Sequence, residues 1–348
     1  MLTEKQLGEI REHLEGAQNP IFYYDNDADG LSAFLIMWKF IGRGKGVAVR
    51  GAPDLNRQYA KRAEQLGADS VFVLDVPLIG EDFLDEFKKK NMNVVWIDHH
   101  DIPSKEHHDV PNLFVYNPNK NSGKEKSSEP TSYLCYKATE RKEDKWIAVA
   151  GCIADHYMPD FALEFAKENP EMWGKGIKEP FDAYYKTEIG RVAQLFNLGL
   201  KDSTSNIVDM QKYLVKCKNP GKVFEDEKMS FVEKYVEIRK KLDDLIRDVK
   251  SNKGDKAIFH LYAGDLSISS ELANEISFNF PGKYVVVGYK KGAILNLSLR
   301  GKNVRKIMEK AIADLEGASG GGHEDAVGAR IQAKDFDKFK EIIENQIK

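Results

Sequence analysis

Residues 21–31 read IFYYDNDADGL, in which a short apolar run leads directly into three aspartates and a glycine. The run Ile21–Tyr24 has the length and the aromatic content of a strand. The residues that follow, Ser32–Ile41, have the apolar pattern of a helix. The stretch therefore predicts a strand, an acidic loop and a helix, in that order.

The same alternation continues through the first half of the chain. Further strand candidates are Gly46–Arg50, Ser70–Leu74, Asn93–Ile97 and Asn112–Tyr116. Further helix candidates are Asn56–Leu66, Asp82–Lys90, Thr131–Glu140 and a helix that ends near Ala154. Strands separated by helices are typical of right-handed βαβ units, so we expect an α/β fold with a largely parallel sheet.

The second half has a different pattern. Strand signals nearly vanish after Asp160, and Phe231–Lys250 places apolar residues at helical spacing, which predicts a long connecting helix. Alternating patterns then return at Ala257–Tyr262, Tyr284–Tyr289, Ala293–Leu299 and Val327–Gln332. We therefore expect a parallel-sheet domain at residues 1–160, a helical segment with the connecting helix at 161–252, and a smaller mixed α/β domain at 253–348.

Acidic residues follow three of the predicted strands directly. They are Asp25, Asp75 and Asp98, and the last is followed by His99 and His100. The carboxyl ends of parallel strands lie at one edge of the sheet, where ligands bind. Carboxylates crowded there repel one another unless cations neutralise them, and oxygen with imidazole ligands suits Mn²⁺ or Mg²⁺ and permits Zn²⁺.

Each acidic feature also has a purely structural interpretation. A calcium loop of the EF-hand type needs glutamate at its twelfth position, but counting from Asp25 that residue is Ile36. An aspartate after a strand, such as Asp75, is commonly only a helix cap. The occurrence of all these features in one chain favours a metal site over separate structural roles.

The acidic motifs resemble those of the DHH phosphoesterase family. The four ordered motifs of the family are matched by Asp25–Leu31 (DNDADGL), Asp75 after VFVL, Asp98–His100 (DHH) and Ala154–His156 (ADH). Near the end of the chain, the motif of the DHH-associated domain is matched by Gly320–His323 (GGGH) with Ala326 and Gly328, preceded by Ser298–Arg300 and Asn303-Val304. The order and number of these matches make the resemblance specific.

Within that family the acidic loop resembles that of RecJ-type exonucleases. The short nanoRNase and cyclic-dinucleotide branches carry a histidine four residues before the first aspartate, where this chain has Ile21. The compact length resembles archaeal RecJ-like proteins. The resemblance implies a metal-dependent phosphodiesterase that uses two divalent cations, Mn²⁺ foremost and Mg²⁺ as the alternative.

The resemblance also assigns roles to individual residues. It implies the metal ligands Asp25, Asp27, Asp75, His99 and Asp155, with Asp75 as the bridging ligand. It implies a catalytic group of Asp98, His99 and His100, in which Asp98 orients His99. Asp29 and His100 are each expected to touch the metal, the substrate phosphate or a neighbouring ligand.

The C-terminal motif implies a domain that holds substrate. The expected substrate-binding residues are Ser298, Arg300, Gly321, Gly322 and His323. Consecutive glycines let a backbone approach a phosphate closely, and an arginine can hold a phosphate with two parallel bonds. The alternative is that the glycines form a flexible linker, which His323 and the strand pattern after it disfavour.

The composition places few limits on the partner. With 42% hydrophobic and 31% charged residues and a net charge of -3, the chain is an ordinary globular protein, and any surface that binds nucleic acid must be local. Cys135, Cys152 and Cys217 are widely spaced, which indicates neither a disulfide framework nor a zinc site. The N-terminus is not a signal peptide, and the most apolar run, Leu31–Ile41, is too short to span a bilayer. We expect a cytoplasmic protein with no membrane association.

The leading functional hypothesis is an exonuclease on single-stranded DNA or RNA that releases nucleoside monophosphates and serves DNA repair. Resemblance to archaeal relatives favours the 3′-to-5′ direction, whereas resemblance to bacterial RecJ favours the opposite one. The same chemistry permits cyclic dinucleotides, short oligonucleotides (nanoRNA) or polyphosphate as substrates. A different class is a replication or repair factor that docks to a helicase or replisome protein through the helical segment after Asp160.

Overall fold

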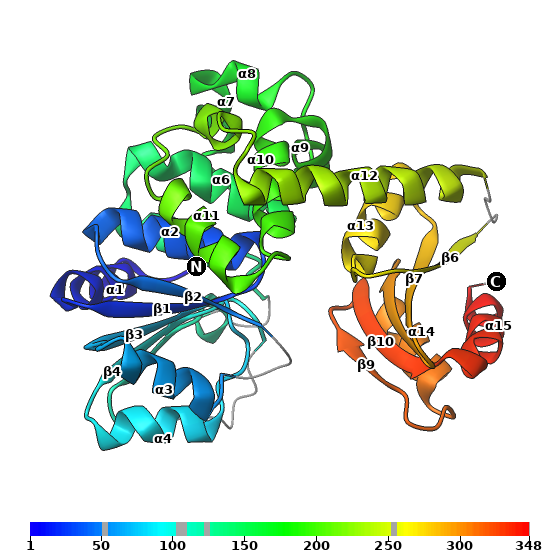
Figure 1. Cartoon of the computed structure of the whole chain (residues 1–348), viewed down its shortest axis with the longest axis horizontal. Helices are drawn as coiled ribbons and strands as arrows, with labels where there is room; N and C mark the ends of the chain where they lie inside the picture. Colours follow the sequence, from blue (N-terminus) through cyan, green and yellow to red (C-terminus); the bar gives the residue numbers. More distant parts are fainter. Residues whose placement is uncertain (51–54, 102–109, 122–125, 252–255, 348) are drawn as a thin grey trace. The chain divides into compact units, whose positions relative to one another are not determined.

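Five parallel strands form the sheet of the N-terminal part, in the order β2-β1-β3-β4-β5 (Figure 1). The strands are β1 Pro20–Asp25, β2 Lys45–Val49, β3 Ser70–Leu74, β4 Asn93–Ile97 and β5 Leu113–Tyr116. The helices along this part of the chain are α1 Glu4–Gly16, α2 Ala28–Ile41, α3 Arg57–Gln65, α4 Glu81–Lys89, α5 Thr131–Thr139 and α6 Lys145–Ala154. Short 3₁₀ turns lie at Pro118–Lys120 and Lys142–Asp144. In the computed structural model, the described residues are 1–50, 55–101, 110–121, 126–251 and 256–347.

Helices cover both faces of this sheet because alternate side chains of each strand point to opposite faces. On one face, Ile21 and Tyr23 join the apolar cluster that includes α3 and α4. On the other face, Phe22 and Tyr24 contact Phe34 of α2, with ring centroids 5.7 and 5.2 Å apart. All five residues of β3 are buried, as a central strand of a parallel sheet requires.

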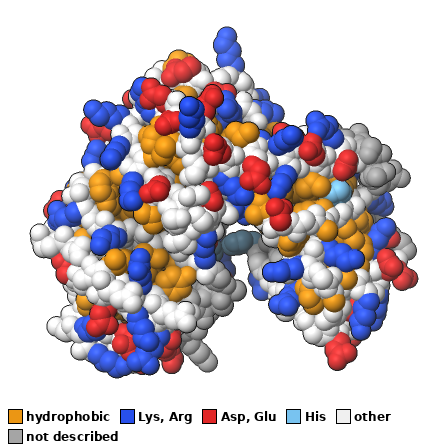
Figure 2. Space-filling view, in the orientation of Figure 1, with side chains coloured by type: hydrophobic (Ala, Val, Ile, Leu, Met, Phe, Trp, Pro, Cys, Tyr) orange, Lys and Arg blue, Asp and Glu red, His pale blue; other side chains and the backbone are white. Residues whose placement is uncertain are grey.

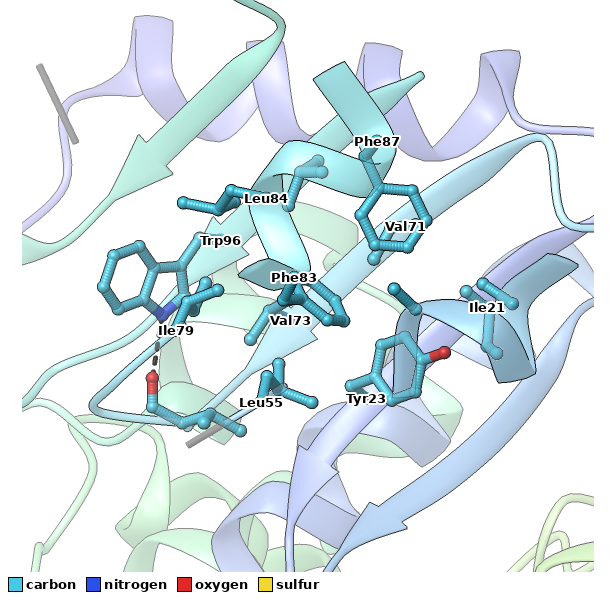
Figure 3. Close-up of a cluster of buried hydrophobic side chains, with 14 of the residues drawn as sticks. Ile21, Tyr23, Leu55, Val71, Val73, Ile79, Phe83, Leu84, Phe87 and Trp96 are labelled. Atoms are coloured by element: carbon cyan, nitrogen blue, oxygen red, sulfur yellow. Dashed lines mark hydrogen bonds between the residues drawn. The ribbon is translucent and has the colours of Figure 1, made fainter. Parts of the chain in front are cut away.

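Figure 3 shows the apolar cluster on the first of these faces. Phe83 and Phe87 of α4 pack over the sheet residues Val71 and Val73. The indole of Trp96 also lies here, and its Nε1 donates a hydrogen bond to the carbonyl of Val76 at 2.9 Å. The cluster packs against β1, β3 and β4, the strands whose carboxyl ends carry the acidic residues.

A helical segment follows the first sheet domain in the chain. It comprises α7 Ala162–Glu168, α8 Pro170–Trp173, α9 Pro180–Lys186, α10 Glu188–Gly199, α11 Thr204–Leu214, a 3₁₀ turn at Pro220–Phe224, and α12 Ser230–Ser251. Lys39 of α2 donates to the carbonyls of Val215 (3.1 Å) and Cys217 (2.9 Å) just beyond α11. By its contacts the chain divides into two units, Met1–Val236 and Glu237–Lys348, so most of the helical segment belongs to the first unit.

The second unit contains a mixed sheet in the order β6-β7-β8-β10-β9, in which only β6 and β7 pair in parallel. Its elements are β6 Ala257–Ala263, α13 Ser269–Asn279, β7 Tyr284–Lys291, β8 Ile294–Arg300, α14 Val304–Ile312, β9 Ser319–Gly322, β10 Ala326–Gln332, a 3₁₀ turn at Ala333–Asp335, and α15 Phe336–Gln346. One apolar cluster joins Met308 of α14 and Phe339 of α15 to the sheet.

The expected fold class is confirmed: a parallel α/β domain, a helical segment and a smaller mixed domain. One strand lay outside the expectation, because the glycine-rich Ser319–Gly322 has little strand propensity. It forms the edge strand β9 through backbone pairing with β10. No helix of the described residues combines the length and apolarity needed to cross a membrane.

Candidate metal centre

Three neighbouring strands deliver the acidic motifs to one edge of the first sheet. Strands β1, β3 and β4 lie side by side and run in the same direction. Asp25 is therefore brought beside Asp75 and Asp98, although the three are far apart in the sequence. Asp155 joins them from the C-terminal end of α6.

The first acidic loop is held by one hydrogen bond within the loop and one to α10. Asp27 caps α2 by accepting a hydrogen bond from the N–H of Gly30 at 2.9 Å. A side chain at Gly30 would place its Cβ 2.6 Å from the carbonyl oxygen of Asp25, so this turn requires glycine. The N–H of Ala28, the first residue of α2, donates to Asn197 of α10 at 2.7 Å. The helical segment thus supports the loop, and no signal in the sequence pointed to Asn197.

The carboxylate of Asp29 is turned toward α5. It accepts hydrogen bonds from the N–H groups of Thr131 (2.8 Å) and Ser132 (3.0 Å) and from the hydroxyl of Ser132. It is buried, and it satisfies the N–H groups at the start of a helix that the preceding Pro130 cannot cap with a side chain. These contacts tie the carboxylate of Asp29 to the start of α5, and its part in binding metal or substrate stays a prediction.

Asp75 lies at the centre of the site. It is buried and has a left-handed backbone, with φ 64°, which turns the chain sharply after β3. Its N–H donates to the carbonyl of Ile97 at 3.0 Å, and its Oδ1 accepts from the Thr131 hydroxyl at 3.1 Å. His99 Nε2 lies 3.4 Å from the same Oδ1.

The two histidines of the DHH motif have different partners. Asp98 Oδ1 lies 2.9 Å from His100 Nδ1, and Asp98 Oδ2 accepts from the His100 N–H at 2.9 Å. The tight turn after β4 brings His100 back onto the carboxylate of Asp98, and the expected orientation of His99 by Asp98 stays a prediction. His99 Nε2 lies 3.6 Å from Asp155 Oδ2, on the side toward α6.

Two asparagines after β5 hold the backbone of this motif. Asn117, which is buried, donates to Asp98 Oδ2 at 3.3 Å and to the carbonyl of His100 at 2.9 Å. Asn119 donates to the carbonyl of His99 at 2.7 Å. Sequence reasoning missed both residues. For Asn117 the available signal was a polar residue directly after a predicted strand, the same signal that identified the aspartates; Asn119 lies two residues further on and had no such signal.

The potential ligand atoms form two compact groups. One consists of Asp25, Asp27 and Asp75, and the other of Asp75, His99 and His100; in each, the atoms lie within 4.8 Å of one another. Asp75 belongs to both groups. These groups contain the predicted ligands Asp25, Asp27, Asp75 and His99, and Asp155 lies beside His99.

Burial and mutual repulsion dominate the electrostatics of this site. Burial and then the neighbouring carboxylates raise the pKa of Asp27 to about 7, and the same causes hold the pKa values of Asp75 and Asp155 well above the usual range. Burial alone lowers the pKa of His100, but its hydrogen bond to Asp98 and the surrounding negative charge raise it overall, from 6.5 to about 9. The buried carboxylates of this cluster therefore lack enough neighbouring positive charge to balance them.

The residues present therefore fit divalent cations. Three carboxylates and two imidazoles offer oxygen and nitrogen ligands, and a cation would remove the repulsion that keeps protons on the carboxylates. This donor set suits Mn²⁺ and Mg²⁺, which prefer such ligands.

The predicted substrate-binding residues lie in the second unit, on β8 and at β9, the two strands that flank β10. Pairing places Arg300 of β8 opposite Ala326 of β10, and the N–H of His323 donates to the Ala326 carbonyl at 2.9 Å. Arg300 donates to Asn274 Oδ1 at 2.5 Å and to Ser270 Oγ at 2.9 Å, both of α13. Ser298 is buried, and its hydroxyl lies 2.9 Å from that of Ser269.

The glycines of this motif differ in what the backbone requires of them. Gly322 has φ 136°, and a Cβ there would lie 2.6 Å from the carbonyl oxygen of Ala326. A Cβ on Gly320 would lie 2.6 Å from the sulfur of Met308, whereas one on Gly321 would meet nothing within 4 Å. Gly320 and Gly322 are thus fixed by packing and backbone shape, and Gly321 is not.

Two family models match the chain. The model described as "DHH family, N-terminal domain" matches residues 21–158, and the model described as "DHHA1 domain" matches residues 255–348. None of the curated proteins compared with the chain matches it.

Solved structures with the same fold include RecJ proteins. RecJ of Thermus thermophilus in complex with Mn²⁺ is 17% identical with a TM-score of 0.67, over 99% of this chain and 55% of that one. The exonuclease RecJ bound to manganese is 18% identical with a TM-score of 0.65, over 99% and 95%. A DHH domain from a member of a family of ribosomal proteins is 16% identical with a TM-score of 0.69, over 99% and 89%. At these identities the likeness establishes the fold.

A parallel-sheet domain with acidic strand ends and a DHH motif, followed by a DHHA1 domain, defines a class of metal-dependent phosphoesterases. The chain belongs to the DHH phosphoesterase family, and its fold is RecJ-like, so the expected family is confirmed.

Proposed function

We propose that this protein is a two-metal phosphodiesterase that degrades single-stranded DNA or RNA from one end and releases nucleoside monophosphates. The observation that carries the proposal is the pair of ligand groups that share Asp75. Two cations with a common carboxylate suit a phosphodiester, because both the attacking and the leaving oxygen need stabilisation.

The proposed ligands are Asp25, Asp27, Asp75, His99 and Asp155. When bound, two divalent cations, with Mn²⁺ favoured, would lower the pKa of a water and neutralise charge on the phosphate. The burial and mutual repulsion of the carboxylates support this assignment, since both are relieved by cations.

The pair of Asp98 and His100 is proposed to act as a proton donor. Asp98 holds His100 through Nδ1, and the local negative charge favours the protonated ring. With Nδ1 bonded to Asp98, Nε2 is the nitrogen assigned to donate toward a phosphate or leaving oxygen. Asn117 keeps the carboxylate in place from the other side.

The second unit is proposed to hold substrate phosphates. Arg300 and His323 lie at the same end of its sheet, on either side of Ala326 of β10, and Gly321 and Gly322 pair with the next residues of β10. The hydroxyl of Ser298 lies 2.9 Å from that of Ser269, the first residue of α13. Arginine and backbone N–H groups both bind phosphate oxygens.

Nucleic acid is the substrate class that we favour over polyphosphate. A polyphosphate chain calls for a continuous basic channel. On the face shown in Figure 2, basic and acidic side chains intermingle instead. Resemblance to archaeal RecJ-like proteins supports the 3′-to-5′ direction.

The deciding experiment is digestion of DNA and RNA oligonucleotides, labelled at either end, with Mn²⁺ or Mg²⁺. We expect stepwise shortening from the 3′ end, on single strands and not on duplexes, with Asp75→Asn as the inactive control. Faster cleavage of a cyclic dinucleotide or of a very short RNA than of longer strands would replace the proposal by one of those substrates. A wild-type protein with no turnover on any of them, yet with a helicase or replisome protein as a stoichiometric partner, would indicate a docking factor.

A further inference from the structure

His156 occupies a backbone position that glycine usually fills. Helix α6 ends with hydrogen bonds from the N–H of His156 to the Ile153 carbonyl (3.3 Å) and from the N–H of Tyr157 to the Cys152 carbonyl (2.8 Å). This is the Schellman arrangement, and its left-handed residue is His156, with φ 56°. The backbone would accept glycine with less strain, so the turn itself does not require an imidazole.

The imidazole stacks on an aromatic ladder from α9. The rings of His156 and Phe181 lie 4.0 Å apart and only 10° from parallel. Phe181 in turn lies 6.0 Å from Tyr185, at 17°. His156 is exposed, and Phe181 and Tyr185 are partly exposed, so the ladder lies at the protein surface. Aromatic rings at a surface, arranged in parallel planes, are the usual means of binding unpaired bases.

The ladder is tied to the metal centre at two points. His156 directly follows the proposed ligand Asp155 in the chain. Tyr184, which contacts the rings of His156 and Tyr185, accepts a hydrogen bond from Asn197 at 3.0 Å. Asn197 is the residue that accepts from the N–H of Ala28 in the first acidic loop. The ring of His156 is thus linked to the metal centre through the chain and through Tyr184 and Asn197.

We infer that His156 and Phe181 form a stacking subsite for a nucleobase, that of the nucleotide whose phosphate lies at the metal centre. The inference rests on the proposed function and adds that the site contacts the base of the substrate as well as its phosphate. Stacking is tolerant of base identity because every base has a π face, which fits an enzyme that shortens strands of any sequence.

The test compares oligonucleotides that differ only in the terminal base. Each single strand carries either a normal nucleotide or an abasic tetrahydrofuran residue at its end, and both ends are examined. For the wild type we expect kcat/KM to be higher with the base present by about tenfold or more. In His156→Gly and Phe181→Leu this ratio should fall toward one.

The variants separate the subsite from the fold. Glycine relieves the left-handed backbone at residue 156, which offsets the lost ring contacts and the added chain entropy, so His156→Gly should stay folded with a Tm near that of the wild type. Phe224→Leu is the matched control, since Phe224 is a partly exposed ring of the same unit that contacts Tyr235 and Arg191. It should retain the wild-type ratio. A wild type that ignores the terminal base, or variants that slow both substrates equally, would overturn the subsite.

A second measurement decides the subsite without turnover. Calorimetry compares binding of 2′-deoxyadenosine 5′-monophosphate with that of 2-deoxyribose 5-phosphate, in the presence of Mn²⁺. A preference of the wild type for the nucleotide that His156→Gly loses supports the subsite, and equal binding by the wild type overturns it. If the wild type cleaves no oligonucleotide, the proposed exonuclease function fails, and this binding comparison still decides the subsite.

Discussion

The hydroxyl of Thr131 donates a hydrogen bond to Asp75 Oδ1 across 3.1 Å, although the two residues lie 56 positions apart. The N–H of the same threonine donates to Asp29 at 2.8 Å. The start of α5 therefore fixes two acidic motifs at once. Asp75 is the carboxylate common to both ligand groups, so its orientation governs the whole site.

Replacing Thr131 should weaken the metal site without unfolding the domain. Thr131→Val keeps the shape but removes the donor to Asp75, and loss of such a supporting bond typically lowers metal affinity by about 10–100-fold. Thr131→Ser, which keeps the hydroxyl, should bind Mn²⁺ nearly as the wild type does. Calorimetric titration checks both variants, and equal affinities for valine and wild type would contradict the role of this bond.

Asp75→Asn should abolish hydrolysis while the fold persists. Asparagine tolerates the left-handed backbone at this position, which alanine would strain, and it removes only the charge. We expect activity to fall by more than about a hundredfold, beyond the loss typical of supporting residues. Without metal the variant should be at least as stable as the wild type, because repulsion is relieved. Urea unfolding in chelator beside oligonucleotide kinetics tests both expectations, and wild-type turnover would remove Asp75 from the metal site.

The metal-free protein should lose stability as the pH rises. The pKa of Asp27 is raised from 3.8 to about 7 in the fold, chiefly by burial and then by Asp25 and Asp29. An acid with a raised pKa binds its proton more tightly in the folded state, so stability is full below the unfolded pKa and falls between about pH 4 and about pH 7. Unfolding in chelator at several pH values measures this slope.

Added Mn²⁺ should reverse the pH trend, since the metal binds the deprotonated carboxylates. Asp69→Asn is a suitable control, because Asp69 lies outside the site and accepts from the N–H groups of Gln18 and Asn19. It should keep the wild-type slope. A stability that rises with pH in chelator would show that the carboxylates do not repel one another as the geometry implies.

Two adjacent glycines should respond differently to alanine. Gly322→Ala should cost roughly 1–3 kcal/mol, because φ is 136° and the Cβ would meet the Ala326 carbonyl. Gly321→Ala should change stability by less than about 0.5 kcal/mol, since its Cβ meets nothing within 4 Å. A rise in KM for Gly321→Ala at unchanged stability would then report a substrate contact. Thermal unfolding and kinetics together make the distinction.

Arg300 and His323 should affect different kinetic constants. Arg300→Ala should mainly raise KM if the arginine binds phosphate in both ground and transition states. His323→Ala should also lower kcat if it donates to the phosphate under attack. Neither variant should alter Mn²⁺ affinity, because neither residue is a proposed ligand. A large loss of metal binding in either would contradict this division.

The sequence determined the element order and the location of the acidic site. Short continuous apolar runs identified the strands, because a parallel sheet buries both of its faces. The residues that follow those runs marked the carboxyl edge of the sheet. Asp25, Asp75 and His99 could be assigned to one place for that reason alone. Their clustering follows from strand direction and strand neighbours, which the βαβ pattern largely dictates.

Hydrogen-bond partners across the site were decided only by the tertiary structure. That Asp98 pairs with His100 depends on the turn after β4, and that Asp29 caps α5 depends on how two helices pack. Asn197 reaches the first loop from a helix 169 positions away. Local pattern cannot specify such contacts, because side-chain partners depend on angles and distances between packed elements. The sequence thus determined which groups carry the chemistry, and the packing decided how each one is held.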